Sequence, residues 1–135
     1  MYQNILVPIS FEADRDAKMA LRVAQTLCGE RGKIQVLHVV EHLPQYSSNL
    51  LPENHLEVAK AAFAEKLKPL VEGMTNAGIE IVEGHSGRTI LDFADSHGCD
   101  CIVIASHRPG LQDYLLGSTA ARVVRHAGCS VHVVR

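Results

Sequence analysis

The chain has 135 residues, which is the length of one ordinary domain. Hydrophobic residues make up 47% and charged residues 21%, a globular composition that excludes an intrinsically disordered chain. The formal net charge of −2 argues against a nucleic-acid or membrane-surface role driven by bulk positive charge. We therefore expect a single domain over residues 1–135 that folds without a disulfide or a metal.

No run of apolar residues is long enough to span a membrane, and no membrane partner is expected. The N-terminal segment Met1–Pro8 lacks the basic start and long apolar core of a signal peptide, which predicts a cytoplasmic protein with reduced thiols. Cys99 and Cys101 would share a face in a strand. They are either small apolar core residues or a metal or redox pair, and the missing Cys-x-x-Cys spacing favours the core.

Five short apolar runs are expected to form strands. The first, second and fourth are nearly continuous and rich in Val and Ile, which is typical of strands covered on both faces in a parallel sheet. The five runs are Ile5–Ile9, Ile34–Val40, Ile79–Val82, Cys101–Ala105 and Val131–Val134.

The segments between these runs have helical apolar spacing. A first helix is expected from Ala17 to Leu27, a second around Leu56–Asn76 after a loop at 43–52, a third from Ser86 to about Gly98, and a fourth from Gly117-Ser118 to Ala127. Glycines mark the expected helix ends: Gly29 and Gly32 after the first, Ala77-Gly78 after the second, and Gly128 as a left-handed cap after the fourth. Pro69 would kink the second helix.

This alternation of strands and helices predicts an α/β fold. We expect an open, doubly wound, five-stranded parallel sheet with helices on both faces. In such a sheet, ligands bind beyond the carboxyl ends of the strands, where the strand order reverses. The residues just past those ends are Pro8–Phe11, Val39–Glu41, Glu83–Ser86 and Ala105–Arg108.

Gly117-Ser118-Thr119 would open the last helix with small residues. A helix N-terminus exposes free N–H groups and the positive end of the helix dipole, so the segment could cradle a phosphate. The alternative is a plain N-cap, in which Ser118 or Thr119 satisfies the first turn.

The order in which these segments follow one another resembles the universal stress protein family over essentially the whole chain. The block Ile102–Pro109 carries the resemblance most strongly, together with Tyr114–Ala121 and Val123–Ala127. The opening Ile5–Ile9, the strand Val36–Val39, Gly84 and the final Cys129–Val134 complete it.

The resemblance implies an ATP site, with Mg²⁺ bound through the phosphates and AMP or ADP as alternatives. ATP-binding members carry Gly-x2-Gly-x9-Gly-Ser/Thr, whereas this chain has Ala105 and Arg108 at the first two glycines, and eight residues separate Arg108 from Gly117. Arg108 would replace a backbone contact to phosphate with a charged one, or it points to solvent. The implied nucleotide-binding residues are Pro8, Ser10, Val39, Ala105, Ser106, His107, Arg108, Gly117, Ser118 and Thr119.

Within that set, Pro8, Ser10 and Val39 would line the adenine pocket, and Ser10 stands where the family usually has Asp. His107 is either near the ribose or phosphates or a surface histidine. The resemblance also implies a homodimer formed through the last strand, by way of Val131 and Val133, and an unpaired edge strand would favour such pairing.

Three functions follow from these observations. The first is a regulatory or protective stress-response module that binds ATP and is not a fast catalyst. The second is a dimeric scaffold or partner binder with a vestigial pocket, which Ser10, Ala105 and Arg108 favour. The third is a phosphoryl- or nucleotidyl-transfer enzyme, which would need an acid/base or metal cluster that the sequence does not assemble. Asp14 and Asp16 are weak candidates for slow hydrolysis, and both are more simply read as acids of a first helical turn.

Overall fold

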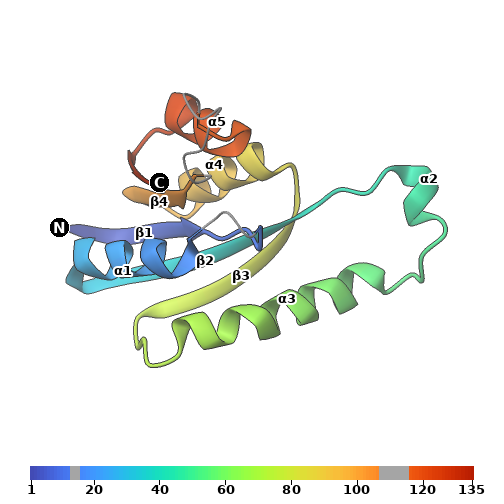
Figure 1. Ribbon diagram of the computed structural model, residues 1–135, viewed down its shortest axis with the longest axis horizontal. Coiled ribbons are helices and arrows are strands. Elements are labelled where there is room, and N and C mark those ends of the chain that lie inside the picture. Colours follow the sequence, from blue (N-terminus) through green and yellow to red (C-terminus); the bar gives the residue numbers. More distant parts are fainter. Residues whose placement is uncertain (13–15, 107–115) are drawn as a thin grey trace.

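The computed structural model describes residues 1–12, 16–106 and 116–135, and strands alternate with helices along the chain (Figure 1). The strands are β1 (Tyr2–Pro8), β2 (Cys28–Glu41), β3 (Ala77–Gly84), β4 (Cys101–Ala105) and β5 (Ser130–Val134). The helices are α1 (Ala17–Leu27), α2 (Gln45–Ser48), α3 (His55–Val71), α4 (Ser86–Ser96) and α5 (Ser118–His126). The predicted alternation is confirmed, with the short α2 as an addition inside the expected loop.

The five strands are parallel and form one sheet in the order β3-β2-β1-β4-β5. The chain builds outward from β1 through β2 to β3, and then crosses over to place β4 on the other side of β1. β1 and β4 pair where Ile5 lies opposite Cys101 and Leu6 opposite Ile102. The sheet order therefore reverses between β1 and β4, which is where open parallel sheets bind ligands.

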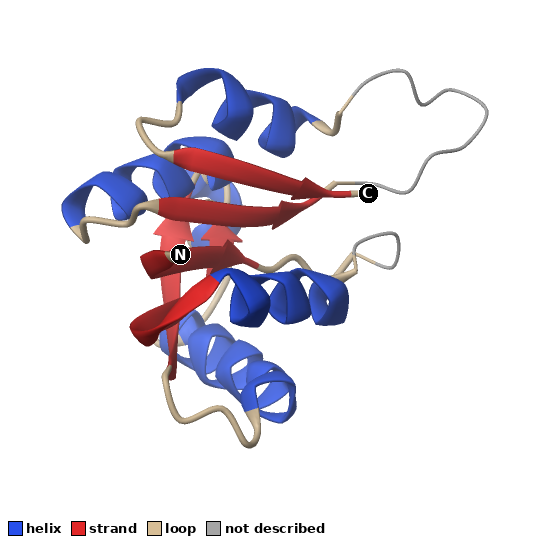
Figure 2. Ribbon diagram, turned by 90° about the vertical axis from the view of Figure 1, so that its left-hand side faces the viewer, coloured by secondary structure: helices blue, strands red, loops and turns tan. Residues whose placement is uncertain are grey.

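One layer of helices covers each face of the sheet, as Figure 2 shows, and this confirms the predicted fold class. Within β1, Ile5 and Val7 pack toward α1 and α3, whereas Leu6 packs toward α4 and α5. Because both faces of β1 are buried, the strand reads as a continuous apolar run. The buried helix residues are Ala20, Leu21, Ala24 and Leu67 in the first layer, and Ile90, Phe93, Ala94, Ala120 and Val123 in the second.

β2 begins six residues earlier than the apolar pattern predicts. The predicted strand starts at Ile34, but β2 starts at Cys28 and contains Gly29 and Gly32, which were expected to lie beyond a helix end. This segment is strand because its backbone pairs with the start of β1, Cys28 lying opposite Tyr2. The side-chain pattern does not indicate a strand here, since the residues after Cys28 and before Ile34 are all glycines or charged residues.

The helix ends also differ from the glycine pattern. α3 ends at Val71, before the predicted Asn76, and Gly73 follows it with a φ of 81°. α4 is followed by Gly98 with a φ of 64°, whereas Gly128 is not in the left-handed region because α5 ends in extended geometry at Ala127. The predicted left-handed cap at Gly128 is therefore wrong.

Within the described ranges, no helix combines the length and apolar character needed to cross a membrane.

Cys99 and Cys101 pack on opposite faces of the sheet. Cys101 opens β4 and belongs to the core under α1 and α3, whereas Cys99 lies before the strand and packs with α4 and α5. The expectation that they share a face is therefore wrong, because Cys99 is not part of the strand. Burial raises the pKa of each of these two thiols to about 11. Both are protonated core residues at neutral pH.

Candidate functional site

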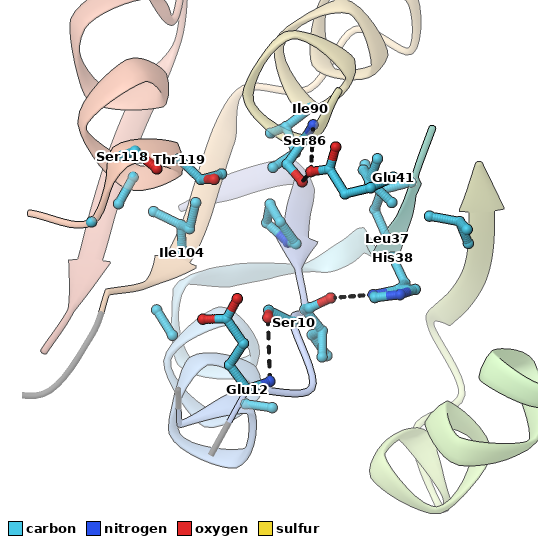
Figure 3. A pocket seen from close by; sticks show the side chains of 18 of the residues that line it. Ser10, Glu12, Leu37, His38, Glu41, Ser86, Ile90, Ile104, Ser118 and Thr119 are labelled. Carbon is cyan, nitrogen blue, oxygen red and sulfur yellow. Dashed lines mark hydrogen bonds between the residues drawn. The ribbon is translucent and has the colours of Figure 1, made fainter. Parts of the chain in front are cut away.

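A cavity of about 500 Å³ lies beyond the carboxyl ends of β1, β2 and β4. This is the place where the sheet order reverses, and the volume is in the range of small-molecule sites. Apolar side chains such as Leu37, Ile90 and Ile104 form part of its walls, and polar groups enter from several elements (Figure 3). The site therefore has the mixed lining expected for an organic ligand with a polar end.

Most of the residues expected at a ligand site line this cavity. Ser106 does not line it: its side chain is only 2% exposed and lies beneath the start of α5. His107 and Arg108 lie outside the described residues. The expected residues that line the cavity are Pro8, Ser10, Val39, Ala105, Gly117, Ser118 and Thr119.

The N-terminus of α5 opens onto the cavity. Gly117 is the N-cap residue, and it provides no side-chain cap; Ser118 and Thr119 follow it in the first turn. The alternative reading of these residues, a Ser or Thr hydroxyl satisfying the first turn, is therefore wrong. The φ of Gly117 is −56°, which any residue can adopt, so glycine matters here for space rather than for conformation. The N–H groups of the first turn, to which the N-cap Gly117 offers no side chain, and the helix dipole favour an anion at this point.

Buried Ser106 positions that helix start. Its hydroxyl oxygen accepts a hydrogen bond from the N–H of Gly117 at 3.4 Å, and its own N–H donates to the carbonyl of Val134 at 2.7 Å. The residue thus ties the end of β4 to both α5 and β5. Its role in the structure is positional rather than one of direct contact with the cavity.

Ser10 and Glu12 form a turn on the opposite side of the cavity from α5. The Ser10 hydroxyl oxygen accepts a hydrogen bond from the N–H of Glu12 at 3.3 Å, a local turn that serine favours. Both side chains are exposed and both line the cavity (Figure 3). Asp16, a weak candidate for hydrolysis, caps α1 by accepting from the N–H of Met19 at 2.9 Å. Asp14 lies outside the described residues.

An aromatic wall, made of Phe11, His38 and Phe63, was not foreseen from the sequence. The His38 ring lies 4.3 Å from that of Phe63 and 4.8 Å from that of Phe11, between centroids. His38 and Phe63 line the cavity, and the Lys66 ammonium lies 5.4 Å from the Phe11 centroid. Phe63 comes from α3, far along the chain, so no local pattern could indicate this contact.

His38 is held in one orientation and is biased toward its neutral form. Its Nδ1 lies 2.8 Å from the carbonyl oxygen of Ile9, and because a carbonyl only accepts, Nδ1 carries the hydrogen. Burial lowers the pKa of His38 below its usual value, and the Lys66 ammonium acts in the same direction, while the bond to Ile9 opposes them. The wall therefore presents a neutral, partly apolar surface to the cavity.

Glu41 reaches across the cavity rim to the start of α4. One carboxylate oxygen, Oε1, accepts the N–H of Ser86 at 3.2 Å and also the Ser86 hydroxyl. Both residues line the cavity; in Figure 3 Glu41 lies toward β2, and Ser86 lies between it and Thr119. Sequence position placed both at strand ends, but the pairing between them depends on the parallel register of β2 and β3, in which Glu41 lies opposite Gly84.

The described part of the lining is therefore acidic. Glu12 and Glu41 contribute carboxylates, and the described lining contains no Lys or Arg. Among the residues that the structure places, no group of three or more His, Cys, Asp or Glu side chains could hold a metal ion. The N-terminus of α5 contributes positive potential to this part of the site.

Comparison with known proteins identifies close relatives. The model of the universal stress protein family matches residues 1–135. Universal stress protein G of Escherichia coli O157:H7 is 32% identical over 146 aligned positions, covering all of both chains. Universal stress protein UspA from Lactobacillus plantarum is 30% identical, with a TM-score of 0.71 over 99% of this chain and 98% of that one. The universal stress protein from Archaeoglobus fulgidus in complex with dAMP has a TM-score of 0.69 over 99% and 98%, and at 20% identity it shows the fold alone.

Proposed function

Because this chain belongs to the universal stress protein family, we propose that it binds an adenine nucleotide in the cavity between β1 and β4. The proposed ligand is ATP with Mg²⁺ held through its phosphates, with AMP and ADP as alternatives. The observation that carries the proposal is the N-terminus of α5, which has a glycine as its N-cap residue and opens onto a cavity of about 500 Å³. The role we propose is that of a regulatory or protective binding module rather than an enzyme.

The proposed ligand would place its phosphates against the first turn of α5. The N–H groups of that turn and the hydroxyls of Ser118 and Thr119 would donate to phosphate oxygens. Ala105 would lie against the ribose. Arg108 and His107, outside the described residues, stay proposed phosphate and ribose contacts.

The adenine would lie toward the ends of β1 and β2, against Pro8, Ser10 and Val39. The Ser10 hydroxyl keeps acceptor capacity beside its bond from Glu12, so it can still receive a hydrogen bond from the base without the charge of an aspartate. The fold neighbour from Archaeoglobus fulgidus was solved with dAMP, which supports an adenine nucleotide as the ligand class.

Nucleotide binding is tested by thermal stability with and without Mg-ATP, AMP and adenosine. A ligand at about 100 times its Kd adds about 2.7 kcal/mol to the free energy of unfolding. Mass spectrometry of small molecules released on unfolding gives an independent readout. The absence of any stabilisation, together with no released nucleotide, would contradict the proposal.

Gly117→Val places a branched side chain where the phosphates would lie, and we expect it to abolish nucleotide stabilisation. Gly78→Val is the matched control, because a Cβ at Gly78 meets nothing within 4 Å and the residue does not line the cavity. Unchanged ATP binding by Gly117→Val would place the phosphates elsewhere.

A dimeric scaffold with a vestigial pocket is the second candidate. The acidic part of the lining favours it, since the Glu41 carboxylate would repel a triphosphate. One outcome distinguishes the scaffold from the nucleotide-binding module. A scaffold would form a dimer, but nucleotide would not change its thermal stability.

We further propose a homodimer through β5, which lies at the edge of the sheet. Val131 and Val133 are partly buried against the core under α5, and the strand's free edge offers backbone groups to a second copy. Sedimentation of the wild-type protein should give a dimer, and Val133→Asp should give monomers. Val58→Asp is the control, because Val58 lies on α3 and is 59% exposed. A monomeric wild-type protein would contradict this interface.

A further inference from the structure

The N-termini of α4 and α5 both face the cavity, and they differ in what they meet there. α4 receives the Glu41 carboxylate, which accepts both the N–H and the hydroxyl of Ser86. α5 begins at Gly117 without a side-chain cap. An internal anion therefore already occupies the start of α4, whereas the N-cap residue of α5, Gly117, offers no side chain to its first turn.

Glu41 is fixed at the cavity rim by this pairing. Two donors from Ser86 share its Oε1 atom, so the negative charge is held at the start of α4; in Figure 3 Glu41 lies toward β2, and Ser86 lies between it and Thr119. Because the described lining carries no Lys or Arg, no described lining cation offsets that charge. The cavity thus has one end that attracts anions, at α5, and one end that repels them and accepts hydrogen bonds, at Glu41.

We propose that Glu41 is a specificity-determining residue, which selects ligands that are anionic at one end only and carry hydrogen-bond donors, such as amino or hydroxyl groups, at the other. This inference rests on the proposed function and narrows its ligand class. A nucleotide lies with its phosphates at α5 and its uncharged part toward Glu41. Each further negative charge on the ligand is disfavoured by the Glu41 carboxylate.

The size of the effect follows from Coulomb's law at a solvent-exposed site. A carboxylate about 10 Å from a ligand charge weakens binding by about 2- to 4-fold per unit charge, for effective dielectric constants of roughly 80 to 40. The effect shrinks with added salt, because the Debye length is about 8 Å at physiological ionic strength. Measurements at about 50 mM salt therefore show it best.

Glu41→Gln removes the charge and keeps an oxygen that can accept from Ser86, so α4 keeps its partner. We expect this variant to bind AMP more tightly than the wild type, while its affinity for uncharged adenosine changes little. Glu41→Asp keeps the charge and should retain the wild-type ratio of AMP to adenosine affinity. Glu80→Gln is the charge-matched control, because Glu80 is exposed on β3 and does not line the cavity.

Titration with inorganic phosphate, followed through the amide signals of Ser118 and Thr119, tests the same charge effect without a nucleotide. Tighter phosphate binding in Glu41→Gln, and not in Glu80→Gln, supports the inference. Equal phosphate affinity in the wild type and Glu41→Gln, or no change of those amide signals in any variant, overturns it.

The two proposals fail in different ways. A wild-type protein that binds none of Mg-ATP, AMP and adenosine removes the proposed function, and the phosphate titration then decides the inference alone. A wild-type protein that binds both AMP and adenosine, with the same AMP-to-adenosine ratio as Glu41→Gln, leaves the proposed function standing. In that case Glu41 only holds the start of α4.

Discussion

The hydroxyl oxygen of Ser106 accepts the N–H of Gly117 at 3.4 Å, and so links the end of β4 to the start of α5. Ser106→Ala removes this acceptor at a side chain that is only 2% exposed. We expect the free energy of unfolding to fall by about 1 kcal/mol, the usual size of one hydrogen bond. We also expect weaker nucleotide binding, because the α5 amides lose a positioning contact. Urea unfolding and a nucleotide titration measure the two effects.

The control for this change is Ser130→Ala, which removes an exposed hydroxyl from β5. It should leave the free energy of unfolding nearly unchanged. Equal stabilities of Ser106→Ala and Ser130→Ala would show that the contact with Gly117 contributes nothing measurable.

His38 makes stability depend on pH. Burial lowers its pKa in the folded protein, so the unfolded chain binds a proton more readily as pH falls below about 6.5. The contribution of neutral His38 to folding stability is therefore complete above about pH 6.5. It is lost as the pH falls toward the lower pKa that His38 has in the folded protein. Each unit by which folding lowers the pKa of His38 corresponds to about 1.4 kcal/mol in the free energy of unfolding.

His38→Asn should reduce that dependence, because the Asn amide can still donate to the carbonyl of Ile9 but does not titrate. Urea unfolding at about pH 7.5 and pH 5.5 measures it. The wild type should lose more stability than His38→Asn over this interval. An identical loss in both proteins would assign the pH dependence to other groups.

Asp100 stabilises the end of the sheet that lies away from the cavity. Its two carboxylate oxygens accept the N–H groups of Gln3 and Asn4 at 2.9 and 3.0 Å, and its own N–H donates to the Asn4 carbonyl. Asp100→Ala should lower the free energy of unfolding by about 1–3 kcal/mol, as expected for bonds to a charged acceptor. Nucleotide affinity should not change.

The control for Asp100→Ala is Asp92→Ala, since Asp92 is 74% exposed and forms an exposed ion pair with Arg88 at 3.9 Å. Such exposed pairs contribute little, so this variant should unfold almost like the wild type. A change of nucleotide affinity in Asp100→Ala would mean that the far end of the sheet influences the cavity.

Cys99 and Cys101 should resist alkylation while the protein is folded. Their pKa of about 11 compares with 9.0 for an ordinary thiol, so the reactive thiolate is roughly a hundredfold scarcer at pH 8. Mass spectrometry after iodoacetamide treatment should find both unmodified in buffer and modified in urea. Rapid modification of either residue in the folded protein would contradict their burial.

The sequence predicted the elements whose signal is local. Strand β1 reads as continuously apolar because both its faces are covered, and α1 and α5 show an apolar stripe because each packs one side on the sheet. The start of β2 was missed because pairing with Tyr2, rather than side-chain pattern, makes Cys28 a strand residue. Gly128 was misread because composition alone does not fix a backbone angle.

The candidate site likewise contains residues that the sequence could predict and contacts that it could not. Residues at strand ends and at the start of a helix, such as Ser10 and Gly117, could be placed from the order of elements alone. The Phe63 contact with His38 and the pairing of Glu41 with Ser86 join segments that are distant in sequence. Only the folded register brings such partners together, so no short motif contains them.

The crossover from β3 to β4 means that the cavity draws on both ends of the chain. Pro8 and Ser10 leave the ribosome early, whereas the α5 amides at Gly117–Thr119 emerge almost last. A nascent chain that has been synthesised only as far as β3 contains Pro8 and Ser10 but lacks the N-terminus of α5. The capacity to hold the proposed nucleotide therefore arises in a single late step of synthesis.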